Sequence, residues 1–146
     1  MKPQLLRVGH SQSPIVVIDD FSGDCGAIAA LADALAPFPP IKGHYFPGLR
    51  RIITEADAQA YSYLHEACRV AAPFIGGPFG VQGIELAEGS FSIVTVKPAD
   101  LAAIQRTPHF DSPEPNIFAM LHYLRVPPAS GTAFYRHRAT AVERCR

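Results

Sequence analysis

The sequence is poor in the residues that several common classes of protein need. Its three cysteines, Cys25, Cys68 and Cys145, lie far apart without a C-x-x-C pair, which argues against a disulfide framework and favours reduced thiols. Thirteen basic residues balance thirteen acidic ones, so composition gives no electrostatic case for a nucleic acid or an anionic membrane as partner. No stretch approaches the ~20 apolar residues of a membrane helix, and no apolar segment follows Lys2 and Arg7 as in a signal peptide. We therefore expect a cytoplasmic protein.

What the sequence does contain fits a globular domain with many turns. Hydrophobic residues make up 48% of the 146 residues and charged residues 18%. Fourteen prolines and eleven glycines favour short strands and loops over a helical bundle. The length is that of one domain, and no internal repeat or linker divides it, so residues 1–146 are expected to form a single domain.

The first half of the chain predicts an α+β arrangement. The β-branched segment Pro14–Asp20 is typical of a strand. Asp24 or Ser22 can cap a following helix, which Pro37 would end. A second helix is predicted from Thr54 to about Val70, with acidic residues in its first turn.

Between these two helices, Tyr45–Arg50 combines two aromatic residues with a Pro-Gly turn signal and predicts a loop. Loops that carry exposed aromatic residues often contact ligands, so Tyr45 is a candidate substrate-binding residue. The alternative is a loop that only covers the core.

The second half changes character and predicts short strands. Ser90–Val96 alternates polar and apolar residues with the period of a half-buried strand. Three further extended stretches are expected at Arg106–Asp111, Ile117–Leu124 and Gly131–Tyr135.

The residues with the most chemical information are His109 and Asp111. On a strand, residues two apart point to the same face, so both could reach one metal ion while Phe110 turns to the opposite side. An imidazole, a carboxylate and one further histidine form the facial triad of non-haem iron, which leaves positions for a 2-oxo acid and dioxygen. The alternative is that Asp111 begins an Asx-type turn with Ser112 and Pro113.

The segment after this motif resembles prolyl-hydroxylase-like oxygenases. In those enzymes, a strand ending in Tyr-Leu is followed by a Gly-rich turn and another strand, as in Ile117–Leu124 and Gly131–Phe134. The resemblance implies that Tyr123 offers its hydroxyl to 2-oxoglutarate and that Thr132 and Phe134 line the same pocket. The alternative is that Tyr123 is a core aromatic residue with a satisfied hydroxyl.

A closer resemblance covers almost the whole chain. Six motifs carry it: Val17–Phe21, Tyr45–Gly48, Phe91–Thr95, Pro108–Ser112, Leu121–Leu124 and Gly131–Thr140. They stand in the order of the DUF6445 family, which looks like a distant relative of the 2-oxoglutarate oxygenases and has no established reaction. This resemblance implies an α+β fold with a partial double-stranded β-helix (a jelly roll), an N-terminal strand and flanking helices.

The chain departs from the oxygenase pattern after Gly131–Tyr135. The distal histidine, and the Arg or Lys that would pair with the far carboxylate of 2-oxoglutarate, are not found on later strands, and the family's glycine is replaced by Ala141. We therefore expect a chain truncated at the C-terminus. His137 is a weaker third candidate ligand, because Arg136 and Arg138 beside it disfavour a cation, whereas Arg136 suits an anionic substrate.

Three functions follow as hypotheses. The first is an oxygenase that uses Fe(II) and 2-oxoglutarate to hydroxylate an unknown small molecule, with His109 and Asp111 as metal ligands. The second is a non-catalytic binding module on the same fold, since the triad is incomplete. The third is a metal-dependent hydrolase that uses His137 as an additional ligand. A half-built sheet would also expose an edge through which copies of the chain could associate.

Overall fold

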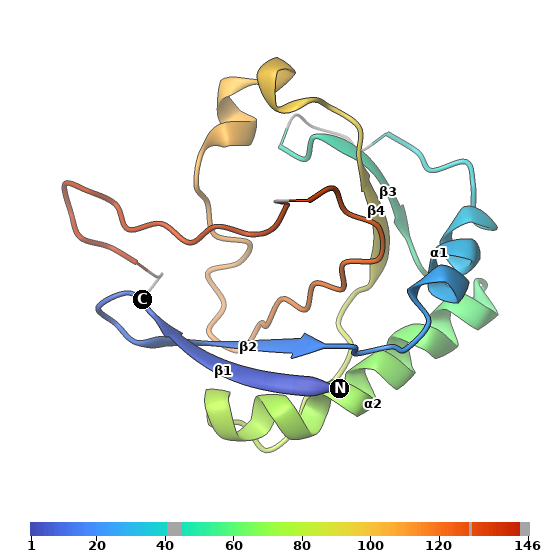
Figure 1. Cartoon of the computed structure of the whole chain (residues 1–146), viewed down its shortest axis with the longest axis horizontal. Coiled ribbons are helices and arrows are strands. Elements are labelled where there is room, and N and C mark those ends of the chain that lie inside the picture. The colour runs from blue at the N-terminus through green and yellow to red at the C-terminus, as the bar shows by residue number, and fades with distance from the viewer. Residues whose placement is uncertain (41–44, 129, 144–146) are drawn as a thin grey trace. The chain divides into compact units, whose positions relative to one another are not determined.

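The structure is a computed structural model, and it describes residues 1–40, 45–128 and 130–143 (Figure 1). It is a mixed α+β structure with two small antiparallel sheets and two α-helices. The chain divides into two compact units. Unit 1 joins Met1–Gly23 with Pro108–Arg146, and unit 2 is the continuous segment Asp24–Thr107.

Unit 1 contains a β-hairpin. Strand β1 (Lys2–Val8) pairs antiparallel with β2 (Ser13–Asp19), in a register that places Lys2 opposite Asp19 and Val8 opposite Ser13. The strand predicted at Pro14–Asp20 is thus confirmed, whereas β1 was not predicted. The turn between the strands has a left-handed backbone at Gly9 (φ 68°) and Gln12 (φ 50°). The Gln12 N–H donates to the Gly9 carbonyl over 3.3 Å.

The rest of unit 1 has little regular structure. The strands expected at Ile117–Leu124, Gly131–Tyr135 and Arg106–Asp111 are not present in the part of the chain that the structure describes, so those predictions were wrong. Five prolines, at positions 108, 113, 115, 127 and 128, interrupt this part of the sequence. Proline has no N–H to donate to a strand ladder, and backbone bonds such as Ile117 N–H to Glu114 C=O form local turns instead.

Unit 2 begins with the short helix α1 (Cys25–Asp33). The side chain of Asp24 caps it by accepting a hydrogen bond from the Ala27 N–H over 2.9 Å, as one of the two expected caps. The helix ends before the proline-containing segment that was expected to stop it. Cys25 and Cys68 are not joined in a disulfide, and Cys145 lies outside the described residues.

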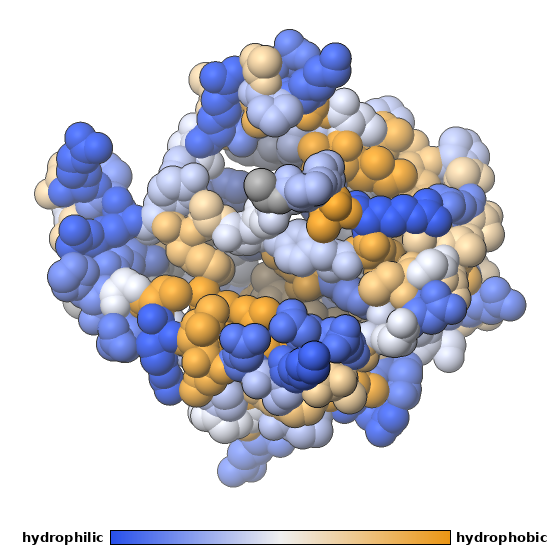
Figure 2. All heavy atoms as spheres, viewed as in Figure 1, coloured by the Kyte–Doolittle hydropathy of each residue, from blue (hydrophilic) through white to orange (hydrophobic). Residues whose placement is uncertain are grey.

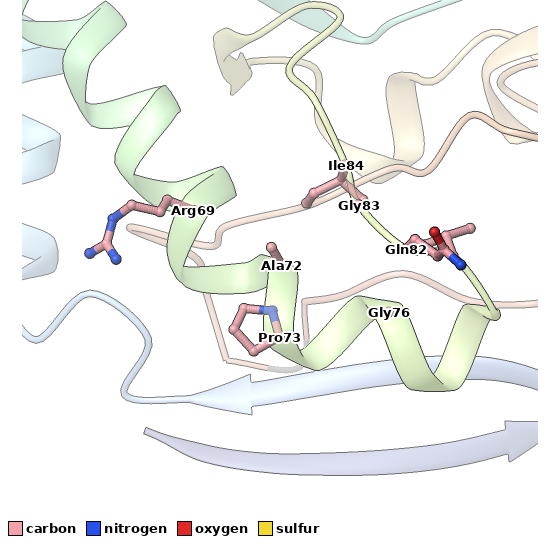
Figure 3. Close-up of a pocket in the computed structure, with 8 residues that line it drawn as sticks. Arg69, Ala72, Pro73, Gly76, Gln82, Gly83 and Ile84 are labelled. Carbon is pink, nitrogen blue, oxygen red and sulfur yellow. The ribbon is translucent and has the colours of Figure 1, made fainter.

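Helix α2 (Ala58–Phe79) is longer than the sequence predicts. It begins after the N-cap Asp57 and passes through Pro73 and Pro78 before ending at Gly80, which has a left-handed backbone (φ 69°). The expected end near Val70 was therefore wrong. Figure 3 shows the helix axis changing direction near Pro73, as expected where a proline interrupts the hydrogen bonds of a helix. No described helix has the length and apolar character needed to cross a membrane.

Unit 2 also contains an antiparallel pair of strands that lie on either side of α2 in the sequence. Strand β3 (Gly48–Ile52) pairs antiparallel with β4 (Ser90–Val94), with Gly48 opposite Val94. The β4 prediction is confirmed, but the last part of the predicted Tyr45–Arg50 loop is strand. Gly48 permits this pairing because a Cβ atom there would lie 1.9 Å from the Ile93 carbonyl oxygen. Two 3-10 helices follow, η1 (Pro98–Asp100) and η2 (Ala103–Arg106).

The buried core of the described residues lies in unit 2. Its buried hydrophobic side chains are Ala29, Phe38, Ile53, Ala60, Ala67, Ala71 and Phe91. Tyr63 of α2 stacks on Phe91 of β4 with 6.2 Å between ring centroids, which joins the helix to the sheet. Unit 1 instead leaves many large apolar residues exposed, including Leu5, Leu6 and Val17 of the hairpin. Figure 2 shows hydrophobic residues interspersed with polar ones on the visible surface.

Candidate metal and co-substrate site

His109 and Asp111 lie close together in unit 1. Their Nε2 and Oδ1 atoms are 3.6 Å apart, and the two side chains are 70% and 77% exposed. The expected proximity is thus present, although a strand does not produce it. The chain around Asp111 is a bend between two non-helical segments, so local chain direction brings the imidazole and the carboxylate to the same side.

Ser112 forms the side-chain hydrogen bond of the turn that, in the alternative interpretation, Asp111 would begin. The Glu114 N–H donates to the Ser112 hydroxyl oxygen over 3.0 Å. This is the short side-chain-to-backbone bond by which serine stabilises a turn. The Asp111 carboxylate therefore stays exposed beside His109 and remains able to bind a cation.

The pair fits two of the ligands that a divalent metal needs. Bonds of about 2.1 Å from each donor can span the 3.6 Å between the two atoms, so one ion can bind both. Within the described residues, however, no group of three or more His, Cys, Asp or Glu side chains gathers around a common point. If His109 and Asp111 bound a metal ion, the described residues would place no third ligand of a facial triad beside them.

His137 is oriented by its own turn. The Thr140 N–H donates to Nδ1 of His137 over 3.3 Å, and the Thr140 hydroxyl lies 2.7 Å from the same nitrogen. An Nδ1 that accepts a backbone hydrogen bond places the proton of a neutral imidazole on Nε2. In that state neither ring nitrogen offers a lone pair to a metal, and His137 does not join the His109–Asp111 pair.

Tyr123 and Thr132, which the oxygenase resemblance assigns to the co-substrate pocket, are in contact. The Tyr123 hydroxyl and the Thr132 hydroxyl lie 2.5 Å apart, a short hydrogen bond between two segments of unit 1. Tyr123 is not a buried core residue, and Phe134 is also exposed. The structure therefore brings together two of the three residues proposed for that pocket.

His122 contacts the two residues Phe21 and Ser22 of unit 1. Its Nε2 lies 3.2 Å from the Ser22 hydroxyl, and its ring meets the Phe21 ring edge-on with 5.5 Å between centroids. Burial lowers the pKa of the His122 imidazole, which favours the neutral ring. Ser22 is one of the two helix caps that the sequence predicts, but its hydroxyl contacts His122 and joins the chain just after β2 to the 117–124 segment.

The two candidate substrate-binding residues lie in different units. Arg136 is in unit 1, where its Nε is 4.0 Å from the carboxylate of Glu143. Tyr45 is in unit 2 and is 74% exposed. Also in unit 2, the guanidinium of Arg50 in β3 covers the ring of Phe46 at 4.7 Å from its centroid.

Sequence reasoning missed Glu143. Its carboxylate accepts hydrogen bonds from the backbone N–H groups of His10 and Ser11, over 3.1 and 2.9 Å. No local pattern could predict this contact, because the partners are separated by more than a hundred residues of sequence.

A shallow hollow in unit 2 offers no matching chemistry. It has a volume of about 270 Å³ and is lined by part of α2 and by residues 81–84 (Figure 3). Arg69 is its charged residue, but Arg69 makes two bonds to Glu66, of 2.8 and 2.6 Å. Figure 3 shows the Arg69 side chain extending away from Gln82 and Ile84. The hollow therefore indicates no class of ligand.

Comparison with known proteins identifies a family but no activity. A family model described as "Family of unknown function (DUF6445)" matches residues 1–146. No curated protein matches the chain, and no solved structure does.

Proposed function

Because this chain belongs to the DUF6445 family, whose function is unknown, we propose a function from the site itself: an oxygenase that depends on Fe(II) and 2-oxoglutarate. The observation that carries the proposal is the 3.6 Å separation of His109 Nε2 and Asp111 Oδ1. Neutral imidazole and carboxylate are the protein ligands that ferrous iron has in this class of enzyme. The substrate to be hydroxylated is an organic small molecule of unknown structure.

The proposal includes the jelly-roll fold that the sequence resemblance implies. A jelly roll is built from antiparallel strands, and both sheets in the described part of the chain are antiparallel. These pairings and the helices α1 and α2 are compatible with such a fold.

The Tyr123–Thr132 pair supports a role in binding the 2-oxo acid. In a hydrogen bond between two hydroxyls, one hydroxyl donates its proton and the other keeps its proton for another partner. That remaining proton can be donated to a carboxylate oxygen of 2-oxoglutarate. Phe134, an exposed aromatic residue two positions after Thr132, would cover the carbon chain.

The bound iron would supply positions for the 2-oxo acid and dioxygen and the means to oxidise a C–H bond. In the balanced reaction, one oxygen atom of dioxygen enters the substrate as a hydroxyl group. The other enters the succinate formed as 2-oxoglutarate loses CO₂. His109 and Asp111 would hold the metal, and the chain would orient the co-substrate.

A second candidate is a non-catalytic binding module. It is favoured by the exposure of His109 and Asp111 and by the lack of a third ligand near them among the described residues. Two exposed ligands would hold a metal ion more weakly than three. A module of this kind would bind the 2-oxo acid or a similar carboxylate without oxidising anything.

An anaerobic titration with Fe(II), with and without 2-oxoglutarate, tests the first proposal. We expect a weak visible charge-transfer band that needs both additions and disappears in Asp111→Asn and His109→Ala. Glu114→Gln is the matched control, because Glu114 is an exposed carboxylate three positions after Asp111, and this variant should keep the band. A band that survives in Asp111→Asn, or that never forms, would contradict the oxygenase proposal. Binding of 2-oxoglutarate without any dependence on iron would favour the binding module.

A further inference from the structure

The turn of the β1–β2 hairpin holds a carboxylate. The two consecutive backbone N–H groups of His10 and Ser11 donate to separate oxygens of Glu143, over 3.1 Å to Oε1 and 2.9 Å to Oε2. The Arg136 guanidinium lies near the same group, with 4.0 Å between its Nε and Oε1. Glu143 is thus a charged side chain that is only 11% exposed.

The turn has the backbone form of an anion-binding nest. Residues with left-handed backbone, Gly9 and Gln12, flank His10 and Ser11 and allow neighbouring N–H groups to converge on one point. Charge-assisted bonds of this kind are shorter and stronger than neutral ones. The bonds from Ser11 and His10 lower the pKa of the Glu143 carboxyl, since they stabilise its charged form.

Glycine is required at position 9 for two reasons. Its φ of 68° is one that L side chains rarely adopt, and a Cβ atom there would lie 2.4 Å from Oε2 of Glu143. The turn therefore leaves room for a carboxylate group where another residue type would place a side chain.

Backbone hydrogen bonds also determine the shape of the segment that carries Glu143. In the segment before Glu143, the His137 N–H donates to the Val142 carbonyl and the Ala141 N–H donates to the His137 carbonyl, each over 2.8 Å. These bonds close a compact loop that presents Glu143 to the hairpin turn. This loop also carries His137 and follows Arg136.

We propose that the Gly9–Gln12 turn is a carboxylate-binding site, with Glu143 as its resident ligand, and that this contact holds the 136–143 segment against the hairpin. The ligand class is a carboxylate, whether a small monocarboxylate or an acidic side chain. The site goes beyond the proposed function and does not depend on iron or 2-oxoglutarate binding.

Chemical rescue of Glu143→Ala tests the site. In this variant the His10 and Ser11 amide signals should move in ¹H–¹⁵N spectra. Sodium acetate should then shift them saturably towards their wild-type positions. Half-saturation is expected on the order of 10 mM, because a ligand of so few atoms gains little binding energy. Glu114→Ala is the matched control, and acetate should leave the His10 and Ser11 signals of this variant unchanged. Sodium chloride of equal ionic strength should leave these signals unchanged in either variant. The proposal would be overturned if acetate shifted the His10 and Ser11 signals equally in both variants. It would also be overturned if replacing Glu143 by alanine left these signals where they are in the wild type.

A pH titration of the unmodified chain gives a second test that needs no variant to fold. Among residues 1–40, 45–128 and 130–143, the charged groups that face Glu143 are the His10 ring and the Arg136 guanidinium, and both favour its ionised form at acid pH. The His10 and Ser11 amide shifts should titrate together, with a midpoint below the ordinary range of a glutamate. A common midpoint within or above that range would show that the turn does not bind the carboxylate as proposed.

Discussion

Replacing Ala141 by glycine should stabilise the protein. Ala141 has a left-handed backbone (φ 56°), and its N–H donates to the His137 carbonyl over 2.8 Å, a bond that glycine would keep. A left-handed backbone costs an L residue roughly 1–2 kcal/mol. Glycine avoids this cost, but it lowers the free energy of unfolding by about 0.4–1 kcal/mol because the unfolded chain gains conformational entropy. The expected net gain is about 1 kcal/mol.

Thermal and urea unfolding measure this change. For a chain of this size, a gain of about 1 kcal/mol corresponds to a rise in Tm of about 3 °C. Ala133→Gly is the matched control, because Ala133 is not among the residues with positive φ. That variant should lose up to about 1 kcal/mol. If Ala141→Gly lost as much as Ala133→Gly, the left-handed backbone at position 141 would be refuted.

Four other outcomes are expected. Gly48→Ala should lower Tm sharply because its Cβ would meet the Ile93 carbonyl oxygen, whereas Gly77→Ala has open space and should not. Asp24→Ala should cost about 1 kcal/mol in urea unfolding by removing the cap of α1. Burial lowers the pKa of His122, so its neutral form contributes stability above the ordinary histidine pKa, and the free energy of unfolding should fall as pH drops through about 6.5 and below. An NMR titration of the His122 ring should show the lowered midpoint. Val17→Lys should reduce any self-association through the exposed hairpin, measured by analytical ultracentrifugation.

Elements with strong local signals could be predicted from the sequence. The β-branched residues of β2, the alternation in β4 and the Asp24 cap of α1 each determine local structure through short-range physics. Helix α2 was predicted, but it begins after the predicted Thr54 and ends after the predicted Val70. The helix continues past Pro73 with a change of axis and is capped by Gly80.

Elements that depend on distant partners could not be predicted. Strand β1 has a mixed sequence, and its pairing with β2 is what makes it a strand. Strand β3 was read as a loop because Pro47-Gly48 is a turn signal; only the pairing of Gly48 with Val94 shows that the glycine permits a close strand contact.

The sequence predicts that His109 and Asp111 lie close together, but the structural reason differs from the predicted one. The closeness of His109 and Asp111 was expected from a strand, but a bend beside the Ser112 turn produces it. The resemblance to the oxygenases assigned Tyr123 and Thr132 to one pocket, but it did not predict the hydrogen bond between their hydroxyls. The bond between Glu143 and the hairpin turn joins residues far apart in sequence, so no motif could indicate it.

The central claim is that His109 and Asp111 bind one metal ion, and paramagnetic NMR tests it most directly. Fe(II) added under anaerobic conditions should broaden the signals of His109 and Asp111 at the lowest metal concentrations. After 2-oxoglutarate is added, broadening should extend to Tyr123 and Thr132, and Asp111→Asn should abolish it at all these positions. Broadening that begins at other acidic residues, or that is the same in Asp111→Asn, would contradict the account.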